Sequence, residues 1–155
     1  MRMLTSNIMN RMAFWLVLGA SVPCAAGEYF ERNGVALDGY DPVAYFVDRK
    51  PVAGNGDLTL EHKGSVFRFS SAANRDRFRA MPDAYSPQYG GFCAYGTASG
   101  YKAKIDPGAW SIVDGKLYLN YDAKVQTEWN KDRAGYIVKA DGRWPEVSKQ
   151  TKVIQ

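Results

Sequence analysis

The chain has 155 residues, 46% of them hydrophobic, and a formal net charge of +4. This length suffices for one domain with an ordinary core, so the fold does not depend on disulfides. The basic residues are scattered rather than gathered with aromatic residues into a stripe, which argues against nucleic acid as a partner. We find no internal repeat, low-complexity tract or long linker, so a single domain is expected.

The first 26 residues have the layout of a secretory signal peptide. Arg2 and Arg11 precede an apolar stretch at 12–22, and small residues follow up to Ala26. The apolar stretch is well short of the roughly 20 residues that cross a bilayer, so a cleaved signal is favoured over a permanent span. Lipidation of Cys24 is the alternative. The sequence therefore predicts export to the periplasm or the cell exterior, without a transmembrane span after cleavage.

Two segments predict strands in the first half of the domain. Gly39-Tyr40-Asp41-Pro42 predicts a turn, because Asp-Pro favours turn initiation, and a short apolar strand is expected after it at 43–46. Residues alternate in polarity from Leu58 to Phe69, with a break at Lys63-Gly64. That pattern predicts a β-hairpin.

A helix is expected next over 72–81. Ser70 or Ser71 is placed to cap its first turn, and Pro82 limits its far end. A further short helical turn is expected at 82–85.

The second half predicts one hairpin and two helices. Asp114-Gly115 separates two apolar runs at 110–113 and 116–119, which is the strongest hairpin signal in the chain. Asp122 is placed to cap a helix that reaches about Asn130. A second helix is expected from about 132 to 140, ending at Asp141-Gly142. The domain is expected to span 27–147, with 148–155 as a frayed tail.

The order of three segments resembles that of the YHS domain family. These segments are Gly39 to Phe46, His62 to Ser70, and Phe78 with Pro82 to Tyr85. Later segments, from Tyr89 to Tyr95 and from Trp110 to Trp144, resemble the exported bacterial branch of YHS domain-containing proteins. The resemblance covers nearly the whole chain after the signal. It implies a small α+β domain with short antiparallel hairpins and about three helices, related to treble-clef-like metal-binding modules.

The resemblance also implies a metal site that this chain has altered. Metal-binding relatives carry one cysteine after Asp-Pro-Val and another near the family serine. The corresponding positions here are Ala44 and Ser70, and neither supplies a thiolate. Of the expected ligands only His62 matches.

His62 is the only imidazole of the chain, and Cys93 is the only thiol outside the signal. Both suit Cu(I) or Zn(II). A structural zinc site takes four ligands, whereas Cu(I) accepts fewer with thioether help, so copper on Cys93, His62 and Met81 is the first metal hypothesis and zinc the second. The ordinary alternatives are a strand histidine, a buried small hydrophobic residue and a core methionine.

Two other classes of function stay open. Tyr89, Phe92 and Tyr95 fall in one glycine-rich stretch that suits an apolar ligand pocket or a partner surface, although the same rings also suit a core. Cys93 and His62 would also suit a thiol enzyme, but no redox, nucleophile-elbow or phosphate-loop motif supports catalysis. The sequence therefore predicts an exported, non-enzymatic YHS-type protein that binds copper, with a metal-free interaction or small-ligand module as the alternative.

Overall fold

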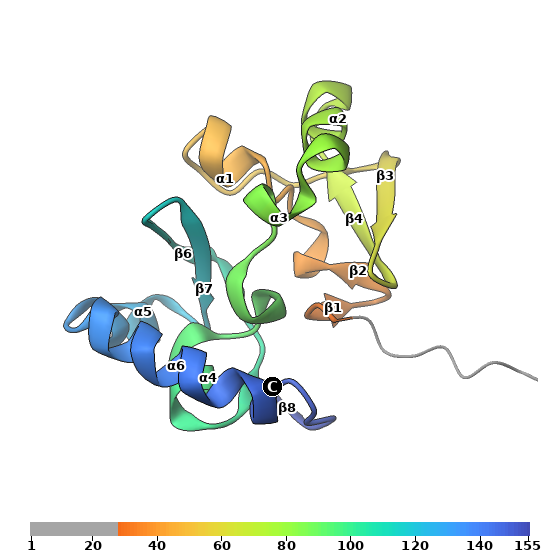
Figure 1. The fold of residues 1–155 in the computed structure, drawn as a ribbon. Coiled ribbons are helices and arrows are strands. Elements are labelled where there is room, and N and C mark those ends of the chain that lie inside the picture. The colour runs from red at the N-terminus through yellow and green to blue at the C-terminus, as the bar shows by residue number, and fades with distance from the viewer. Residues whose placement is uncertain (1–27) are drawn as a thin grey trace, which may run out of the picture.

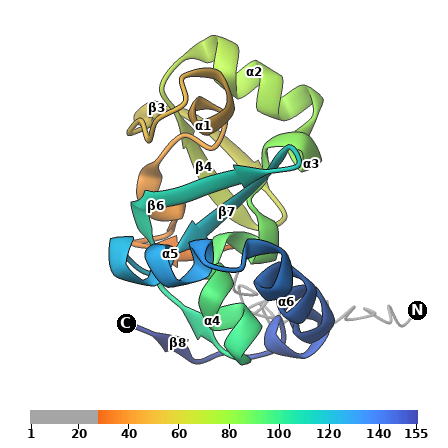
Figure 2. The same cartoon turned by 90° about the vertical axis from the view of Figure 1, so that its left-hand side faces the viewer.

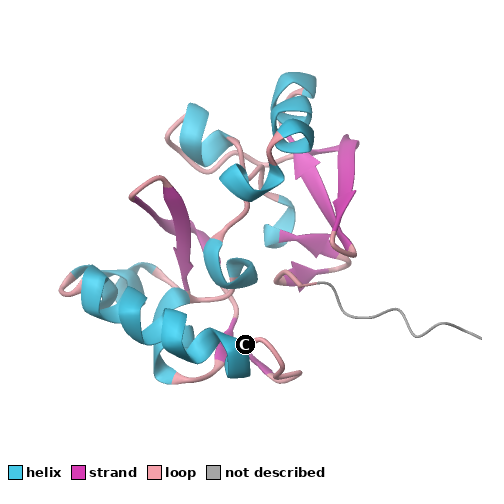
Figure 3. Ribbon diagram, in the orientation of Figure 1, coloured by secondary structure: helices cyan, strands magenta, loops and turns pink. Residues whose placement is uncertain are grey.

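The computed structural model describes residues 28–155, so the predicted signal peptide and Cys24 lie outside the described residues. Helices and short strands alternate along this part of the chain (Figure 3). Four sheets of two strands each form, together with six α-helices. The α+β class predicted from the sequence is confirmed, with twice the expected number of helices.

The elements follow one another along the chain as Figure 1 shows. The bounds are β1 (Glu31–Arg32), β2 (Val35–Ala36), α1 (Ala44–Val47), β3 (Asn55–His62), β4 (Ser65–Phe69), α2 (Ala72–Ala80), α3 (Pro82–Tyr85), α4 (Ala94–Ser99), β5 (Lys102–Ala103), β6 (Asp106–Val113), β7 (Lys116–Asn120), α5 (Ala123–Asn130), α6 (Arg133–Val147) and β8 (Val153–Ile154). Two 3₁₀ turns, η1 (Leu37–Gly39) and η2 (Gln88–Gly91), lie between them.

Three of the sheets are antiparallel hairpins and one joins distant segments. The pairs β1–β2, β3–β4 and β6–β7 are antiparallel, whereas β5 pairs in parallel with β8 near the end of the chain. The β6–β7 hairpin runs between α1, α2 and α3 on one side and α4, α5 and α6 on the other (Figure 2). The molecule is therefore built around this hairpin.

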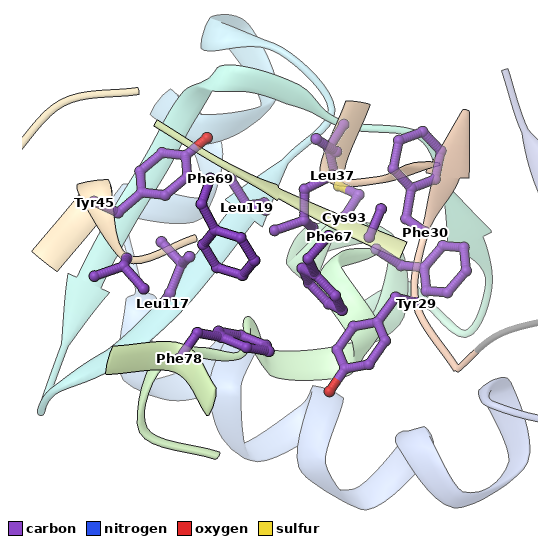
Figure 4. Packing of buried hydrophobic residues seen from close by; sticks show 14 of the residues in the cluster. Tyr29, Phe30, Leu37, Tyr45, Phe67, Phe69, Phe78, Cys93, Leu117 and Leu119 are labelled. Atoms are coloured by element: carbon purple, nitrogen blue, oxygen red, sulfur yellow. The ribbon is translucent and has the colours of Figure 1, made fainter. Parts of the chain in front are cut away.

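The core is aromatic and lies mainly between the two long hairpins (Figure 4). Phe78 of α2 packs on Phe67 of β4 with ring centroids 4.8 Å apart, and Leu117 and Leu119 of β7 are fully buried beside them. A second cluster is centred on Trp129 and Tyr118, whose rings lie 5.5 Å apart. The two clusters are continuous, because Tyr95 and Trp144 pack against both.

Both predicted hairpins and most predicted helix starts are confirmed. β3 and β4 turn at Lys63-Gly64, and β6 and β7 turn at Asp114-Gly115. Ser71 and Asp122 cap α2 and α5, because their side chains accept the N–H groups of Asn74 and Val125. The short helix after Pro82 is confirmed as α3. Local capping and turn signals were therefore sufficient to predict these hairpins and helix starts.

The strand predicted at 43–46 is wrong, because Ala44–Val47 form the helix α1 and Val43 is its N-cap. Asp41 Oδ1 accepts the Val43 N–H at 2.8 Å and the Ala44 N–H at 3.3 Å. These bonds satisfy two donors at the start of a helical turn. The apolar run is buried on this helix rather than in a sheet.

The predicted end of the last helix is also wrong. α6 continues through Asp141, Gly142 and Pro145 to Val147. Ala140 and Val147 are buried on one face and Trp144 packs on that face as well, so tertiary burial outweighs the Asp-Gly stop signal. The tail differs from expectation too, since Val153–Ile154 form β8 and the Lys104 N–H donates to the Ile154 carbonyl at 2.8 Å. Among residues 28–155, every helix is too short or too polar to cross a bilayer.

Candidate functional site

Cys93 occupies the N-cap of α4 and is only 1% exposed. Its sulfur accepts the Gly96 N–H at 3.4 Å, and its thiol donates to Asn120 Oδ1 at 3.7 Å. The Asn120 amide is held in this orientation because Oδ1 also accepts the Tyr95 N–H at 3.2 Å. The thiol therefore faces an amide oxygen.

These surroundings favour the neutral thiol. Burial raises the pKa of the Cys93 thiol, and the backbone N–H groups of Gly96, Tyr121 and Tyr95 offset part of that rise. A thiolate would lie against the lone pairs of Asn120 Oδ1, whereas the thiol donates to them. Metal ligation and nucleophilic attack both require the thiolate. Each of those roles carries the cost of ionising a buried group.

A small apolar pocket of about 220 Å³ adjoins Cys93. Its walls are Cys93, Tyr95, Tyr101, Ala103, Tyr121, Val125 and Ile154. The chain's last strand lies across it, and the Tyr121 hydroxyl donates to the Gln155 main-chain oxygen at 2.8 Å. Ligand sites for organic molecules are usually about 300–1,000 Å³, so this pocket is below the usual range.

The other two proposed metal ligands lie in different surroundings. His62 ends β3 among aromatic rings, with centroids 5.6 Å from Phe78 and 6.2 Å from Tyr29, and its buried Nε2 has no hydrogen-bond partner among the described residues. Met81, between α2 and α3, is 55% exposed, so the core role considered for it is wrong. No group of three or more His, Cys, Asp or Glu side chains within residues 28–155 could hold a metal ion. The copper site on Cys93, His62 and Met81 stays a prediction.

A larger open groove of about 790 Å³ lies where the first described residues meet the last ones. Its lining comes from five parts of the chain: residues 28–31, Lys63 of the β3–β4 turn, the η2 turn with Pro87 and Phe92, Lys102 of β5, and the end of α6 with the segment that follows it. The volume falls within the range of sites that hold small organic molecules. Tyr89 and Phe92, two of the three predicted pocket residues, line this groove, whereas Tyr95 lines the smaller pocket.

One wall of the groove is a continuous row of aromatic rings. The Trp144 ring lies 6.4 Å from that of Phe92 and 5.9 Å from that of Tyr89, and Phe92 in turn lies 5.9 Å from Phe30. Phe30 is 3%, Phe92 5% and Tyr89 6% exposed, whereas Trp144 is half-buried, so Trp144 is the most exposed residue of the row. Trp144 reaches it because α6 extends past the expected stop.

The η2 turn that forms the floor of the groove has unusual backbone geometry. Tyr89, Gly90 and Gly91 have consecutive positive φ angles of 54°, 60° and 76°. A side chain on Gly90 would collide with the Glu28 carbonyl, and the Gly90 carbonyl accepts the Phe30 N–H at 2.7 Å. Tyr89 is held in this left-handed conformation while its hydroxyl donates to Asp141 Oδ1 at 2.8 Å. Non-glycine residues in this region cluster at functional sites.

Lys102 is the ammonium group of the groove that forms no ion pair within the described chain. Its Nζ donates to the Ser148 carbonyl at 2.9 Å and lies 4.7 Å from the centre of the Phe92 ring. Burial lowers the pKa of Lys102. The other lysines of the groove are paired, Lys63 with Glu28 at 3.4 Å and Lys149 with Glu146 at 2.8 Å. Lys102 is therefore the lysine of the groove whose charge no carboxylate of the described residues neutralises.

Sequence reasoning did not identify Lys102 or the first and last described segments as site residues. They are separated by up to 127 positions, from Glu28 to Gln155, and share no motif. Trp144 could have been found, because Ile137, Ala140, Trp144 and Val147 recur with helical spacing.

Comparison of the chain with protein-family models, curated proteins and solved structures gave no match. The resemblance to the YHS family therefore stays a prediction, and function has to be inferred from the geometry of the site.

Proposed function

We propose that this protein is an exported, non-enzymatic binding module that takes a small organic ligand in the groove between residues 28–31 and the end of α6. The observation that carries this proposal is the 790 Å³ groove with its aromatic wall of Phe30, Tyr89, Phe92 and Trp144. Export rests on the predicted signal peptide. This proposal takes up the small-ligand alternative of the sequence analysis.

Three properties of the groove favour ligand binding over simple packing. It is large enough for a molecule of drug size, and its lining combines aromatic rings with many polar and charged side chains, among them Glu31, Lys102 and Gln150. Its floor is a turn of three residues in the left-handed backbone conformation. This turn, rather than a strand or an α-helix, holds the rings in place. A pre-formed wall of this kind reduces the ordering cost of binding.

The metal and enzyme hypotheses receive less support from the geometry. Cys93 is buried as a neutral thiol against Asn120, and His62 is packed among Tyr29, Phe67 and Phe78. Copper binding stays a prediction that an anaerobic Cu(I) titration against a competing chelator would test, with Cys93→Ser and His62→Ala as variants.

The groove is tested with the neutral fluorescent probe N-phenyl-1-naphthylamine. We expect saturable one-to-one binding with enhanced probe emission, and at least a tenfold loss of affinity in Ser148→Trp, which fills the groove from its exposed rim. Val138→Trp is the matched control, since Val138 is 72% exposed on α6 and does not line the groove. Circular dichroism confirms that both variants fold.

Absence of saturable binding to the folded protein would overturn the proposal. Equal loss in both tryptophan variants would also overturn it, because the bound probe would then lie outside the groove.

A further inference from the structure

We infer that the ligand of the groove carries an anionic head, a carboxylate or a sulfonate, that pairs with Lys102 while its flat apolar body lies on the aromatic wall. This inference rests on the proposed function and adds the chemical class of the ligand.

Lys102 lies where the anionic head and the apolar body of such a ligand would meet. Its ammonium lies 4.7 Å from the Phe92 ring centre, at one edge of the row that continues to Trp144. Because the ammonium already covers the Phe92 ring, the apolar group of an anion bound to Nζ would lie against the rim of the row, where Trp144 is the most exposed residue. The ammonium already donates to the Ser148 carbonyl, which leaves two of its three N–H donors for a ligand.

Partial burial makes this charge more valuable to an anion than a surface lysine would be. Lys102 loses hydration in the groove, and no carboxylate of the described chain compensates for that loss. Ion pairs and charge-assisted hydrogen bonds strengthen as water is excluded, whereas fully exposed pairs contribute little. A ligand anion would supply the missing counter-charge.

The carboxylates of the groove do not cancel this preference. Glu28 forms an ion pair with Lys63, and Lys149 forms an ion pair with Glu146. Glu31, on β1, is the remaining acidic side chain of the lining. The negative charge of Glu31 repels an anion. Removing that charge therefore tests whether the groove prefers anionic ligands.

The experiment compares two probes that share one body. 8-Anilino-1-naphthalenesulfonate carries a sulfonate, and N-phenyl-1-naphthylamine lacks it. We expect the anionic probe to bind the purified protein more tightly, and Lys102→Met to lower its affinity about tenfold while leaving the neutral probe within about twofold. Lys102→Arg should restore anion binding, because it restores the charge.

Two further variants serve as controls. Lys149→Met removes a lysine that also lines the groove but is paired with Glu146, so we expect a change of less than about threefold for either probe. Glu31→Gln should strengthen binding of the anionic probe and leave the neutral one unchanged.

The outcomes separate this inference from the proposed function. Tight neutral binding with no preference for the sulfonate, or equal effects of Lys102→Met and Lys149→Met, would overturn the anion assignment and leave the groove as a site for uncharged ligands. Failure of both probes to bind the folded protein would overturn the proposed function itself.

Discussion

At the scale of single residues, Cys93 shows how burial decides the chemistry of a reactive group. A free thiol at a helix N-cap receives backbone N–H groups that favour a thiolate. Here burial raises the thiol pKa in spite of those donors, and the bond to Asn120 Oδ1 uses the thiol proton. Both features disfavour the thiolate while the fold is intact, although an N-cap position would favour it.

This arrangement predicts a loss of stability at alkaline pH. Because the pKa of Cys93 is higher in the folded than in the unfolded state, the unfolded chain releases the proton first as pH rises. The contribution to stability is complete below the unfolded thiol's pKa and is lost above about pH 8, with a slope of up to about 1.4 kcal/mol per pH unit.

Urea unfolding of wild type and Cys93→Ala across this range measures the effect. The raised pKa of Tyr45, which does not depend on Cys93, acts in both proteins and cancels in the comparison. A wild-type curve as flat as that of the variant would contradict the prediction.

At the scale of elements, Asp41 connects the start of α1, which follows it directly, to the distant junction between β4 and α2. This fully buried carboxylate accepts two N–H groups at the start of α1 through Oδ1. Oδ2 accepts the Ser70 N–H and hydroxyl, and the Asn74 side-chain amide of α2. One side chain therefore fixes α1, the end of β4 and the first turn of α2 relative to one another.

Replacing Asp41 with alanine is expected to destabilise the fold by about 3 kcal/mol or more, because it leaves several buried donors without an acceptor. Asp76→Ala is the matched control, since Asp76 is an exposed aspartate that pairs with Arg79 at 2.7 Å, and we expect a change below about 1 kcal/mol. Chemical denaturation of the two variants measures the difference, and equal losses would refute the role assigned to Asp41.

The same element-scale logic explains which predictions from sequence succeeded. Caps and turns such as Ser71, Asp122 and Asp114-Gly115 are formed by interactions between residues at most four positions apart. The local sequence was therefore enough to predict them. The start of α1 is held by Asp41, whose Oδ1 accepts two N–H groups within three residues, so its signal was local but was interpreted as a turn before a strand. The continuation of α6 depends on the rings around Trp144, which are distant in sequence, and local propensity could not have found it.

At the scale of the whole molecule, the groove exists because distant segments meet. Residues 28–31 dock on η2 through the Phe30 N–H, while the parallel β5–β8 pair brings the last described residues to the opposite side. Aromatic residues of the groove were visible in the sequence, but the cation that completes it comes from β5. No pattern of sequence spacing relates Lys102 to Phe30. The contribution of Lys102 to the groove could therefore not be predicted from the sequence.

The two hydrophobic clusters should also unfold together. Tyr95 and Trp144 pack against both, and the rings continue from Phe92 through Trp144 to Tyr89 and Tyr118 without a polar layer. Small domains with one continuous core usually unfold in a single transition.

Phe78→Leu provides the test, because Phe78 belongs to the first cluster, where it packs on Phe67 and Phe69, whereas Trp129 lies at the centre of the second. We expect a loss of about 1 kcal/mol, with the tryptophan-fluorescence and far-UV circular dichroism transitions shifting by the same amount and with an unchanged dependence on denaturant. Because Trp110 packs against the first cluster, the comparison is made in a Trp110→Phe background, and if the clusters were independent the fluorescence midpoint would then stay in place while the dichroism transition broadened. A common shift instead means that a substitution in α2 lowers the stability of the groove wall on α6, since both belong to one cooperative core.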